Sequence, residues 1–181
     1  MTNMYFIALV APKEINEEVL KWKQLMKDRF SSVVALRSPA HITLVPPFWM
    51  DETLENNLEN AISNFSQQQI PFEVRLKNFA AFKPRVIYVD VLASQSLQDI
   101  HSYLQKFLIA TRLFTIKTED RPFHPHMTIA TRDLHKKAFQ EAWEIFQNKK
   151  YEACWITNGI SLLKHNQKNW DVIFTSQFNS V

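Results

Sequence analysis

Hydrophobic positions recur along this chain with two different spacings, one typical of strands and one typical of helices. A compact apolar run at residues 5–10, ended by Pro12, predicts a first strand. Apolar side chains at steps of three and four then predict an amphipathic helix over residues 15–30. The same spacing predicts three further helices, whose apolar stripes begin at Leu54, Leu97 and Leu134.

The remaining apolar segments predict further strands, at residues 32–36, 41–48, 72–79, 86–92, 124–130, 153–157, 160–164 and 170–178. Strands that alternate with four helices predict an α+β or α/β protein in which helices cover the sheet faces. No linker rich in Gly, Ser or Pro divides the chain, so we expect residues 1–181 to form a single bilobal domain.

Polar residues before three of the helices have the pattern of N-terminal caps. We expect Asp51 to cap the second helix, a capping box at residues 96–99 to open the third, and Asp133 to cap the fourth. These three positions define where the predicted helices begin.

One short pattern occurs twice, as His-x-Thr followed by an apolar residue. The first copy contains His41 and Thr43, and the second contains His126 and Thr128. Each lies in a predicted strand and is followed by an aspartate that we expect to cap a helix. The repeat predicts two similar lobes related by a pseudo-twofold axis, with the two strands meeting near that axis.

Side chains two residues apart on a strand point to the same face, so each copy presents an imidazole and a hydroxyl together. Two lobes that face each other would bring four such groups into one site. A neutral imidazole can accept the proton of an attacking hydroxyl or water, while a protonated one donates to the leaving alkoxide. The threonine hydroxyls can bind non-bridging phosphate oxygens. The set therefore predicts metal-free phosphodiester chemistry, without showing which histidine is the acid. The alternative is two ordinary strands with polar outer faces.

Composition narrows the choice of function. With one glycine, Gly159, the chain cannot contain a P-loop, a dinucleotide-binding fingerprint or a G-x-S-x-G nucleophile elbow. A single cysteine, Cys154, excludes an internal disulfide, and we interpret it as a buried thiol of a protein from the reducing cytoplasm. No apolar run approaches the ~20 residues of a membrane span. The basic excess, 21 Lys and Arg against 18 Asp and Glu, permits an anionic partner.

Residues 38–48 (SPAHITLVPPF) and 122–130 (PFHPHMTIA) resemble the 2H phosphoesterase superfamily, in its bacterial 2′-5′ RNA ligase-like or cyclic phosphodiesterase branch. The resemblance implies a bilobal α+β fold with two antiparallel or mixed sheets, about four flanking helices and a cleft between the lobes. It also implies that His41, Thr43, His126 and Thr128 form a catalytic tetrad that hydrolyses or forms 2′-linked phosphodiesters without a cofactor. The expected substrate is a nucleotide or RNA end with a 2′,3′-cyclic phosphate or 2′-5′ linkage, and we expect a monomer.

Other residues near the two motifs have predicted roles in substrate binding. Relatives often carry a basic residue soon after the second motif; here it is Arg132, which binds phosphate if the strand stays regular. Phe48 and Phe123 could stack on a nucleobase, although core packing is the alternative.

A metal centre and a binding module are the rival interpretations of the site. His124 and His126, with Glu119 and Asp120 nearby, have the spacing of some metal sites, but the first motif offers no carboxylate and we expect no metal. A non-catalytic nucleotide or RNA-binding module would not need both a general acid and a general base. We expect the remaining histidines to be exposed: His101, His135 and His165.

Overall fold

The computed structural model describes residues 1–117 and 121–179, and it confirms the predicted α+β class. The helices are α1 (Lys13–Phe30), α2 (Glu55–Ser66), α3 (Gln95–Ala110) and α4 (Lys136–Phe146), with 3₁₀ turns η1 (Val34–Arg37) and η2 (Glu52–Leu54). The strands are β1 (Thr2–Val10), β2 (His41–Asp51), β3 (Phe72–Phe82), β4 (Val86–Val91), β5 (His126–Ala130), β6 (Glu152–Thr157), β7 (Gly159–His165) and β8 (Trp170–Gln177).

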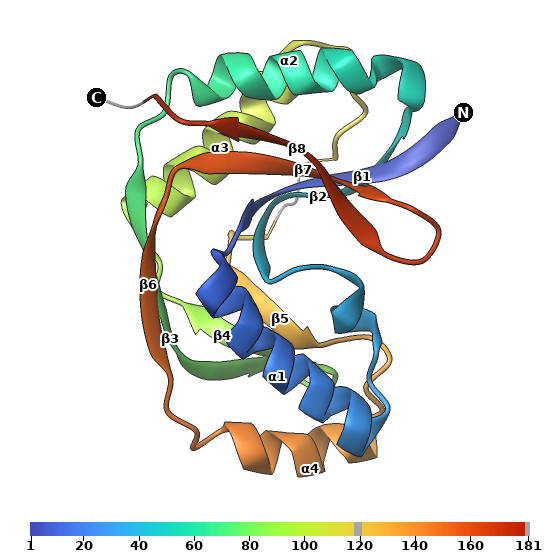
Figure 1. Ribbon diagram of the computed structural model, residues 1–181, viewed down its shortest axis with the longest axis vertical. Helices are drawn as coiled ribbons and strands as arrows, with labels where there is room; N and C mark the ends of the chain where they lie inside the picture. Colours follow the sequence, from blue (N-terminus) through green and yellow to red (C-terminus); the bar gives the residue numbers. More distant parts are fainter. Residues whose placement is uncertain (118–120, 180–181) are drawn as a thin grey trace.

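The strands form two antiparallel sheets of four, and each sheet ends on a strand that carries a His-x-Thr motif (Figure 1). The first has the order β2-β1-β7-β8 and the second β5-β4-β3-β6. In the first, β1 pairs with β2 so that Ala8 lies opposite Thr43. In the second, β4 pairs with β5 so that Tyr88 lies opposite Thr128. The edge strands β2 and β5 contact each other, which brings the two motifs to the middle of the molecule.

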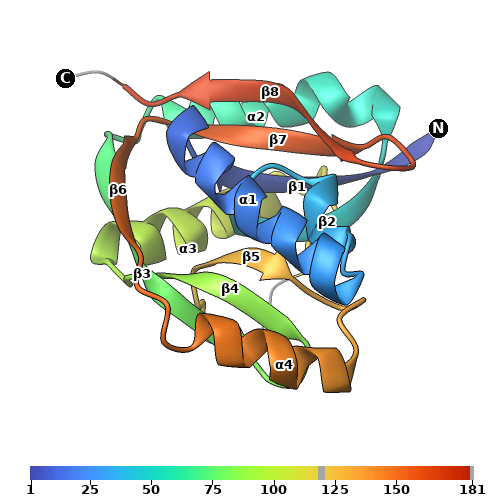
Figure 2. The same ribbon diagram turned by 60° about the horizontal axis from the view of Figure 1, so that its bottom comes forward.

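The helices are exchanged between the two sheets, as the turned view makes plain (Figure 2). Helix α1 joins β1 to β2 in the first sheet, yet it packs against β5 of the second. Helix α3 joins β4 to β5 in the second sheet, yet it packs against β2 of the first. Helix α2 covers β7 and β8, and α4 lies against β3 and α1. Each motif strand is therefore backed by a helix from the other half of the chain.

The alternation predicted for the motif strands is confirmed. Ile42 and Leu44 on β2, and Met127 and Ile129 on β5, are 0% exposed, whereas the histidines and threonines between them are partly exposed. Burying an aliphatic side chain of this size stabilises the fold by about 1.5–3 kcal/mol. Because the apolar face of each strand is fixed against its covering helix, the polar face must point into the space between the lobes.

The strand predicted at residues 32–36 is wrong, because this segment contains η1 instead. The carboxylate of Asp133 accepts hydrogen bonds from the backbone N–H groups of Val33 (2.6 Å) and Val34 (2.9 Å) and from the Ser32 hydroxyl (2.9 Å). Backbone groups held in this way cannot pair in a sheet. Asp133 consequently does not cap α4, which begins at Lys136 with His135 in the N-cap position and without a side-chain cap.

The other two predicted caps also differ from the structure, one in the residue that caps the helix and one in the element that is capped. Ser94, not the predicted box at residues 96–99, caps α3 by accepting a hydrogen bond from the Leu97 N–H (3.2 Å). Asp51 does act as a cap, but of the turn η2 that leads into α2, by accepting from the Thr53 N–H (3.0 Å). The helix stripes were located correctly while their first residues were not, because caps depend on single hydrogen bonds.

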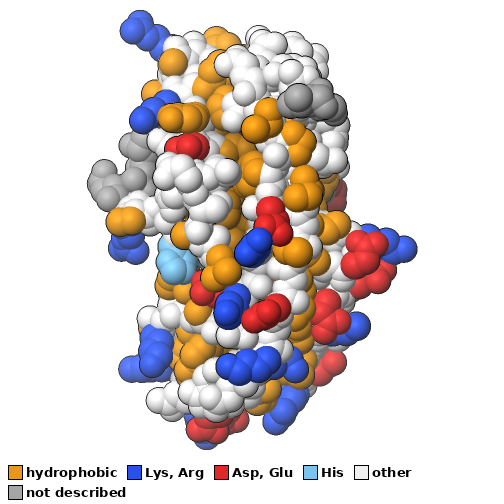
Figure 3. Space-filling view, turned by 90° about the vertical axis from the view of Figure 1, so that its left-hand side faces the viewer, with side chains coloured by type: hydrophobic (Ala, Val, Ile, Leu, Met, Phe, Trp, Pro, Cys, Tyr) orange, Lys and Arg blue, Asp and Glu red, His pale blue; other side chains and the backbone are white. Residues whose placement is uncertain are grey.

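Cys154 is exposed, contrary to the buried thiol that we predicted. It lies on β6, the edge strand of the second sheet, on the face of the strand that also carries the exposed Glu152 and Ile156. Figure 3 shows hydrophobic side chains running along this side of the molecule, and exposed apolar residues on it include Ile156. In the described part of the chain, no helix is long and apolar enough to span a bilayer.

Candidate active site

A cavity of about 560 Å³ lies where the two motif strands face each other. Three of the four predicted tetrad residues line it: His41 and Thr43 from the first sheet and Thr128 from the second. Its other lining residues are Met4, Phe6, Val34, Ala35, Arg37, Ser38, Pro47, Thr131, Arg132, His165 and Trp170. His126 does not line the cavity itself, but it is close enough for its charge to lower the pKa of His41.

The two histidines are held by the same backbone device. Nδ1 of His41 lies 2.7 Å from the Pro39 carbonyl oxygen, and Nδ1 of His126 lies 2.8 Å from the His124 carbonyl oxygen. A carbonyl can only accept, so each Nδ1 carries the hydrogen and donates it. Nε2 is then the nitrogen that can exchange a proton with a substrate, as an acceptor when the ring is neutral and as a donor when it is protonated.

The surroundings of His41 favour its neutral form. Burial lowers the pKa of His41, the hydrogen bond to Pro39 opposes this, and the positive charges of Lys23 and His126 add to the lowering, so that the pKa is about 4. The ring packs against Phe6, with the ring centres 4.8 Å apart. At neutral pH in the empty cleft, His41 is therefore an uncharged imidazole and a proton acceptor.

His126 lies in an aromatic setting instead. Its ring centre is 5.1 Å from Phe82, which meets it edge-on, and 5.1 Å from Tyr88. The Tyr88 hydroxyl lies 3.2 Å from Nε2 of His124, and burial together with the charge of Asp90 raises the pKa of Tyr88. The Tyr88 hydroxyl is therefore protonated at neutral pH and can donate to His124.

The charges around the cavity suit an anion. Arg37 and Arg132 both line it, and none of its described lining residues is acidic. A cleft lined by one sign of charge attracts a ligand of the opposite sign. Arg132 lies beyond the end of β5 and lines the cavity, whereas Arg37 is brought there by η1, which forms where residues 32–36 were predicted to be a strand.

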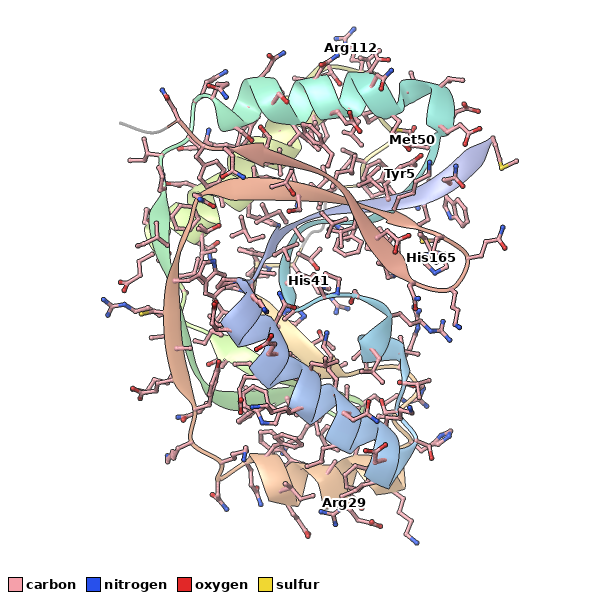
Figure 4. The ribbon with its side chains drawn as sticks, viewed as in Figure 1. Tyr5, Arg29, His41, Met50, Arg112 and His165 are labelled. Atoms are coloured by element: carbon pink, nitrogen blue, oxygen red, sulfur yellow. The ribbon has the colours of Figure 1, made fainter. Side chains whose placement is uncertain are left out.

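Figure 4 shows His41 between the two sheets and His165 on the hairpin that joins β7 to β8. The structure corrects the prediction for His165, which is partly buried at the end of β7 and lines the cavity. The centre of its ring lies 4.8 Å from the centre of the Trp170 ring, and the Trp170 ring centre lies 4.7 Å from that of Phe6. These aromatic rings form a wall that continues from His41 along the first sheet. Because the rings come from strands that are far apart in the sequence, no local pattern predicts this wall.

The two phenylalanines predicted to stack on a nucleobase lie elsewhere. Phe48 is 6% exposed and packs in the core, because it shares the face of β2 that carries Ile42 and Leu44. Phe123 has one ring face covered by His101, which stacks on it at 3.8 Å. His101 is accordingly partly buried rather than exposed, and its Nε2 lies 2.8 Å from Nε2 of Gln105. The burial of Phe48 thus contradicts its predicted stacking role and agrees with the core-packing alternative, and His101 is not exposed as predicted.

The remaining histidine predictions concern the chain surface and a possible metal. His135 is exposed, as predicted. His124 is exposed and lies 3.6 Å from Asp90. Glu119 and Asp120, the carboxylates considered for a metal centre, lie outside the described residues. Within residues 1–117 and 121–179, no three His, Cys, Asp or Glu side chains gather as a metal-binding group.

Known proteins share the sequence pattern and the fold of this chain. Residues 11–169 match the model of the 2′-5′ RNA ligase superfamily. A predicted phosphoesterase of Staphylococcus epidermidis is 26% identical over 173 residues, covering 93% of this chain and 95% of the relative. The RNA 2′,3′-cyclic phosphodiesterase of Bacillus subtilis is 27% identical over 96 residues, covering 51% of each chain. The crystal structure of Escherichia coli LigT complexed with 3′-AMP has the same fold, with a TM-score of 0.73, 17% identity and coverage of 99% and 100%. The chain, with its paired His-x-Thr strands at facing sheet edges, therefore belongs to the 2′-5′ RNA ligase superfamily of 2H phosphoesterases.

Proposed function

We propose that this protein is a metal-independent phosphodiesterase that acts on 2′,3′-cyclic phosphates or 2′-5′ linkages at nucleotide or RNA ends. One observation carries the proposal: a cationic cavity between the lobes is lined by His41, Thr43 and Thr128, with His126 within electrostatic reach. This is an arrangement that two-histidine acid–base catalysis requires.

The reaction divides between the two imidazoles. A water molecule attacks phosphorus of the cyclic phosphate, and the neutral imidazole takes its proton. The bond from phosphorus to one ribose oxygen breaks, and the protonated imidazole donates to that oxygen. The products are a phosphomonoester and a free ribose hydroxyl, and the two histidines end with exchanged protonation states. If the 5′-hydroxyl of a second ribose attacks phosphorus in place of water, and the bond to the 3′ oxygen breaks with a proton donated to that oxygen, the product is a 2′-5′ linkage.

The hydroxyls and guanidinium groups hold the phosphate in this scheme. Thr43 and Thr128 donate to the non-bridging oxygens from opposite sides, and Arg132 and Arg37 neutralise their charge. Such positioning acts beyond the proton transfers, because it aligns the attacking and leaving oxygens in line.

The relatives support the substrate class. One is named as an RNA 2′,3′-cyclic phosphodiesterase, and LigT has been crystallised with 3′-AMP and with phosphate. A nucleoside 3′-monophosphate is one product of opening a 2′,3′-cyclic phosphate, so this ligand is consistent with the proposed chemistry.

The test is turnover of nucleoside 2′,3′-cyclic phosphates and of a short 2′-5′-linked oligonucleotide, each in the presence of a chelator. We expect hydrolysis of at least one of these with an unchanged rate after dialysis against EDTA, since the histidines supply both proton transfers. Activity that is lost on dialysis and restored by zinc or manganese would contradict metal independence. Tight binding of the substrates without turnover would instead identify a non-catalytic nucleotide or RNA-binding module.

A further inference from the structure

Lys23 is a buried cation outside the cavity that the proposed chemistry uses. It lies in the middle of α1, and its side chain belongs to a residue only 3% exposed. Its ammonium donates to the Ser38 carbonyl at 2.9 Å. Among the described residues, no carboxylate lies within ion-pair distance of it. Burial alone lowers the pKa of Lys23 to about 8, so it carries its charge at neutral pH.

An unpaired buried charge is costly to a fold, and lysines are rarely fully buried without a partner. Glu17 of the same helix is exposed and lies 3.8 Å from the ammonium of Lys13 instead. Lys13, Glu17 and Lys23 line a second cavity of about 390 Å³, which shares Arg37, Ser38 and Trp170 with the cleft. Lys23 thus lies behind the cleft wall, close to the substrate site without lining it.

The atom that Lys23 binds belongs to the backbone that positions His41. Ser38 lies three residues before His41, and the next carbonyl, that of Pro39, accepts the hydrogen bond from the ring. Asn16, two helical turns before Lys23, accepts from the N–H of Ala40. One face of α1 therefore holds the two consecutive peptide units, 38–39 and 39–40, that lead into the first motif.

The second half of the site has the same contact with a different donor. Nε2 of Gln98, on α3, donates to the Phe123 carbonyl at 3.3 Å, and Phe123 lies three residues before His126. In each half a helix side chain therefore holds the carbonyl three residues ahead of the motif histidine. A neutral amide suffices for His126, so holding the backbone does not by itself explain a buried ammonium behind His41.

We propose that Lys23 is a positioning residue of the site: it fixes the Ser38 carbonyl, and its charge adds to the effect of burial in disfavouring a proton on His41 until an anionic substrate enters the cleft. The part played by the substrate rests on the proposed function, whereas the effect of the Lys23 charge on His41 can be measured without a substrate. An entering phosphate offsets the positive field, and His41 can then carry a proton during the reaction.

Every charged group that faces His41 in the described cleft is a cation or a titratable ring. Arg37 precedes β2, Arg132 follows β5, His126 lies on β5 and His165 ends β7. The arginines lie on the cleft surface, where water and a bound phosphate screen their charge. Lys23 differs because burial protects its field from screening.

The experiment compares two variants that separate charge from hydrogen bond. K23Q keeps an amide donor, as Gln98 does in the other half, and removes the charge; K23M removes both. We expect the NMR titration midpoint of His41, about 4 in the unaltered protein, to rise by roughly one pH unit in both variants. The limb of the kcat/KM profile that reports His41 moves by the same amount. Because only K23M loses the backbone contact, its kcat falls roughly tenfold more than that of K23Q.

Two controls define the outcome. K21Q makes the same change on the same helix at an exposed lysine bonded to Glu18, and it leaves the His41 titration in place. Q98M removes the neutral contact of the other half, and it also leaves the His41 titration in place. A K23Q protein that is folded, by its NMR spectrum, and titrates His41 as the unaltered protein does would overturn the proposal.

A measurement on the unaltered protein covers variants that do not fold. With lysine labelled at Nζ, Lys23 should titrate near 8, below the surface lysines at about 10.4. A Lys23 that titrates with the surface lysines would overturn the proposal. If the protein cleaves none of the proposed substrates, the function is wrong, yet the His41 titration in K23Q still decides the role of Lys23.

Discussion

The two halves of the cleft share their backbone geometry and differ in chemistry. In each, Nδ1 of the motif histidine donates to the carbonyl two residues before it, and a helix side chain holds the carbonyl three residues before it. Around His41 lie a buried ammonium and Phe6, while around His126 lie Phe82 and Tyr88. The repeated motif therefore fixes where the two rings lie, whereas the neighbours that are not repeated set how each ring exchanges protons.

Such a difference is what the proposed reaction needs. Two coupled imidazoles in identical surroundings would share their two titration steps equally, and neither would be reserved as acid or base. Environments that separate the proton affinities of two like groups are a general route to a division of roles. The following predictions test whether the halves are as equivalent in geometry, and as different in chemistry, as the structure indicates.

The largest expected effect comes from removing either ring. H41A and H126A should each lower kcat/KM on a 2′,3′-cyclic phosphate by roughly 10²–10⁴-fold, because each loses a proton transfer. The double variant should be little worse than the single ones, since the pair acts as a unit. The matched control is H135A, at an exposed N-cap outside the cleft, which should retain near-normal turnover. A single variant that keeps its activity would break the equivalence.

A second substrate can show which of the two histidines is the general acid and which is the general base. A diester whose leaving group is p-nitrophenolate needs no proton on departure, so it should restore turnover to the variant that lacks the acid and not to the variant that lacks the base. Equal rescue of H41A and H126A would contradict a division of roles between the halves.

The threonines should show a smaller and more symmetric effect. T43V and T128V each remove one hydroxyl donor and keep the side-chain shape, so each should lower kcat by roughly 10–150-fold, the equivalent of a hydrogen bond to a charged oxygen. Steady-state kinetics on the same cyclic phosphate measures both. An effect confined to one of the two variants would show that the phosphate is held from one side.

Asp133 joins the halves, and its loss should appear in stability. D133A removes three hydrogen bonds to the Ser32–Val34 segment, so we expect a loss of about 3 kcal/mol in the free energy of unfolding, or roughly 6–12 °C in Tm. Urea unfolding and calorimetry measure these quantities. D133N keeps one acceptor oxygen and should lose less; an unchanged Tm in D133A would show that this link does not hold the cleft segment.

The smallest expected effect is a pH dependence that belongs to His41. The pKa of His41 is about 4 in the folded protein and about 6.5 when unfolded, so the unfolded chain binds the extra proton between these values. Stability is therefore full above about pH 6.5 and is lost as the pH falls, by about 2 kcal/mol between pH 7 and pH 5. Urea unfolding of H41Q should lack this portion of the slope. An identical slope in H41Q would place the titrating group elsewhere.

The sequence was sufficient for features with a local period. The alternation around His41 and His126 correctly indicated which side chains are buried, and the helical stripes lie where expected. The doubled motif also indicated that two strands would meet. These inferences succeed because they depend on neighbours two to four residues apart, where backbone geometry dictates the outcome.

What the sequence did not reveal depends on distant partners. Asp133 has the residue type of a helix cap, but its carboxylate bonds to N–H groups a hundred positions away, and η1 forms where a strand was expected. The face of Phe48 was readable, since it shares the spacing of Leu44. Lys23 also carried a signal, because it follows Val19 by four residues within the apolar stripe of α1. Only the position of Ser38 explains why a lysine is accommodated there.

The order of the first sheet has a consequence for biosynthesis. Its second strand, β1, pairs on one side with β2 but on the other with β7, through partners such as Tyr5 and Lys164. A ribosome adds about 5–20 residues per second, so the N-terminal strand waits roughly 8–30 seconds for its second neighbour. Throughout this interval the unpaired edge of β1 can pair with other polypeptides. We therefore expect the nascent chain to bind a chaperone that holds it unfolded until β7 has been synthesised.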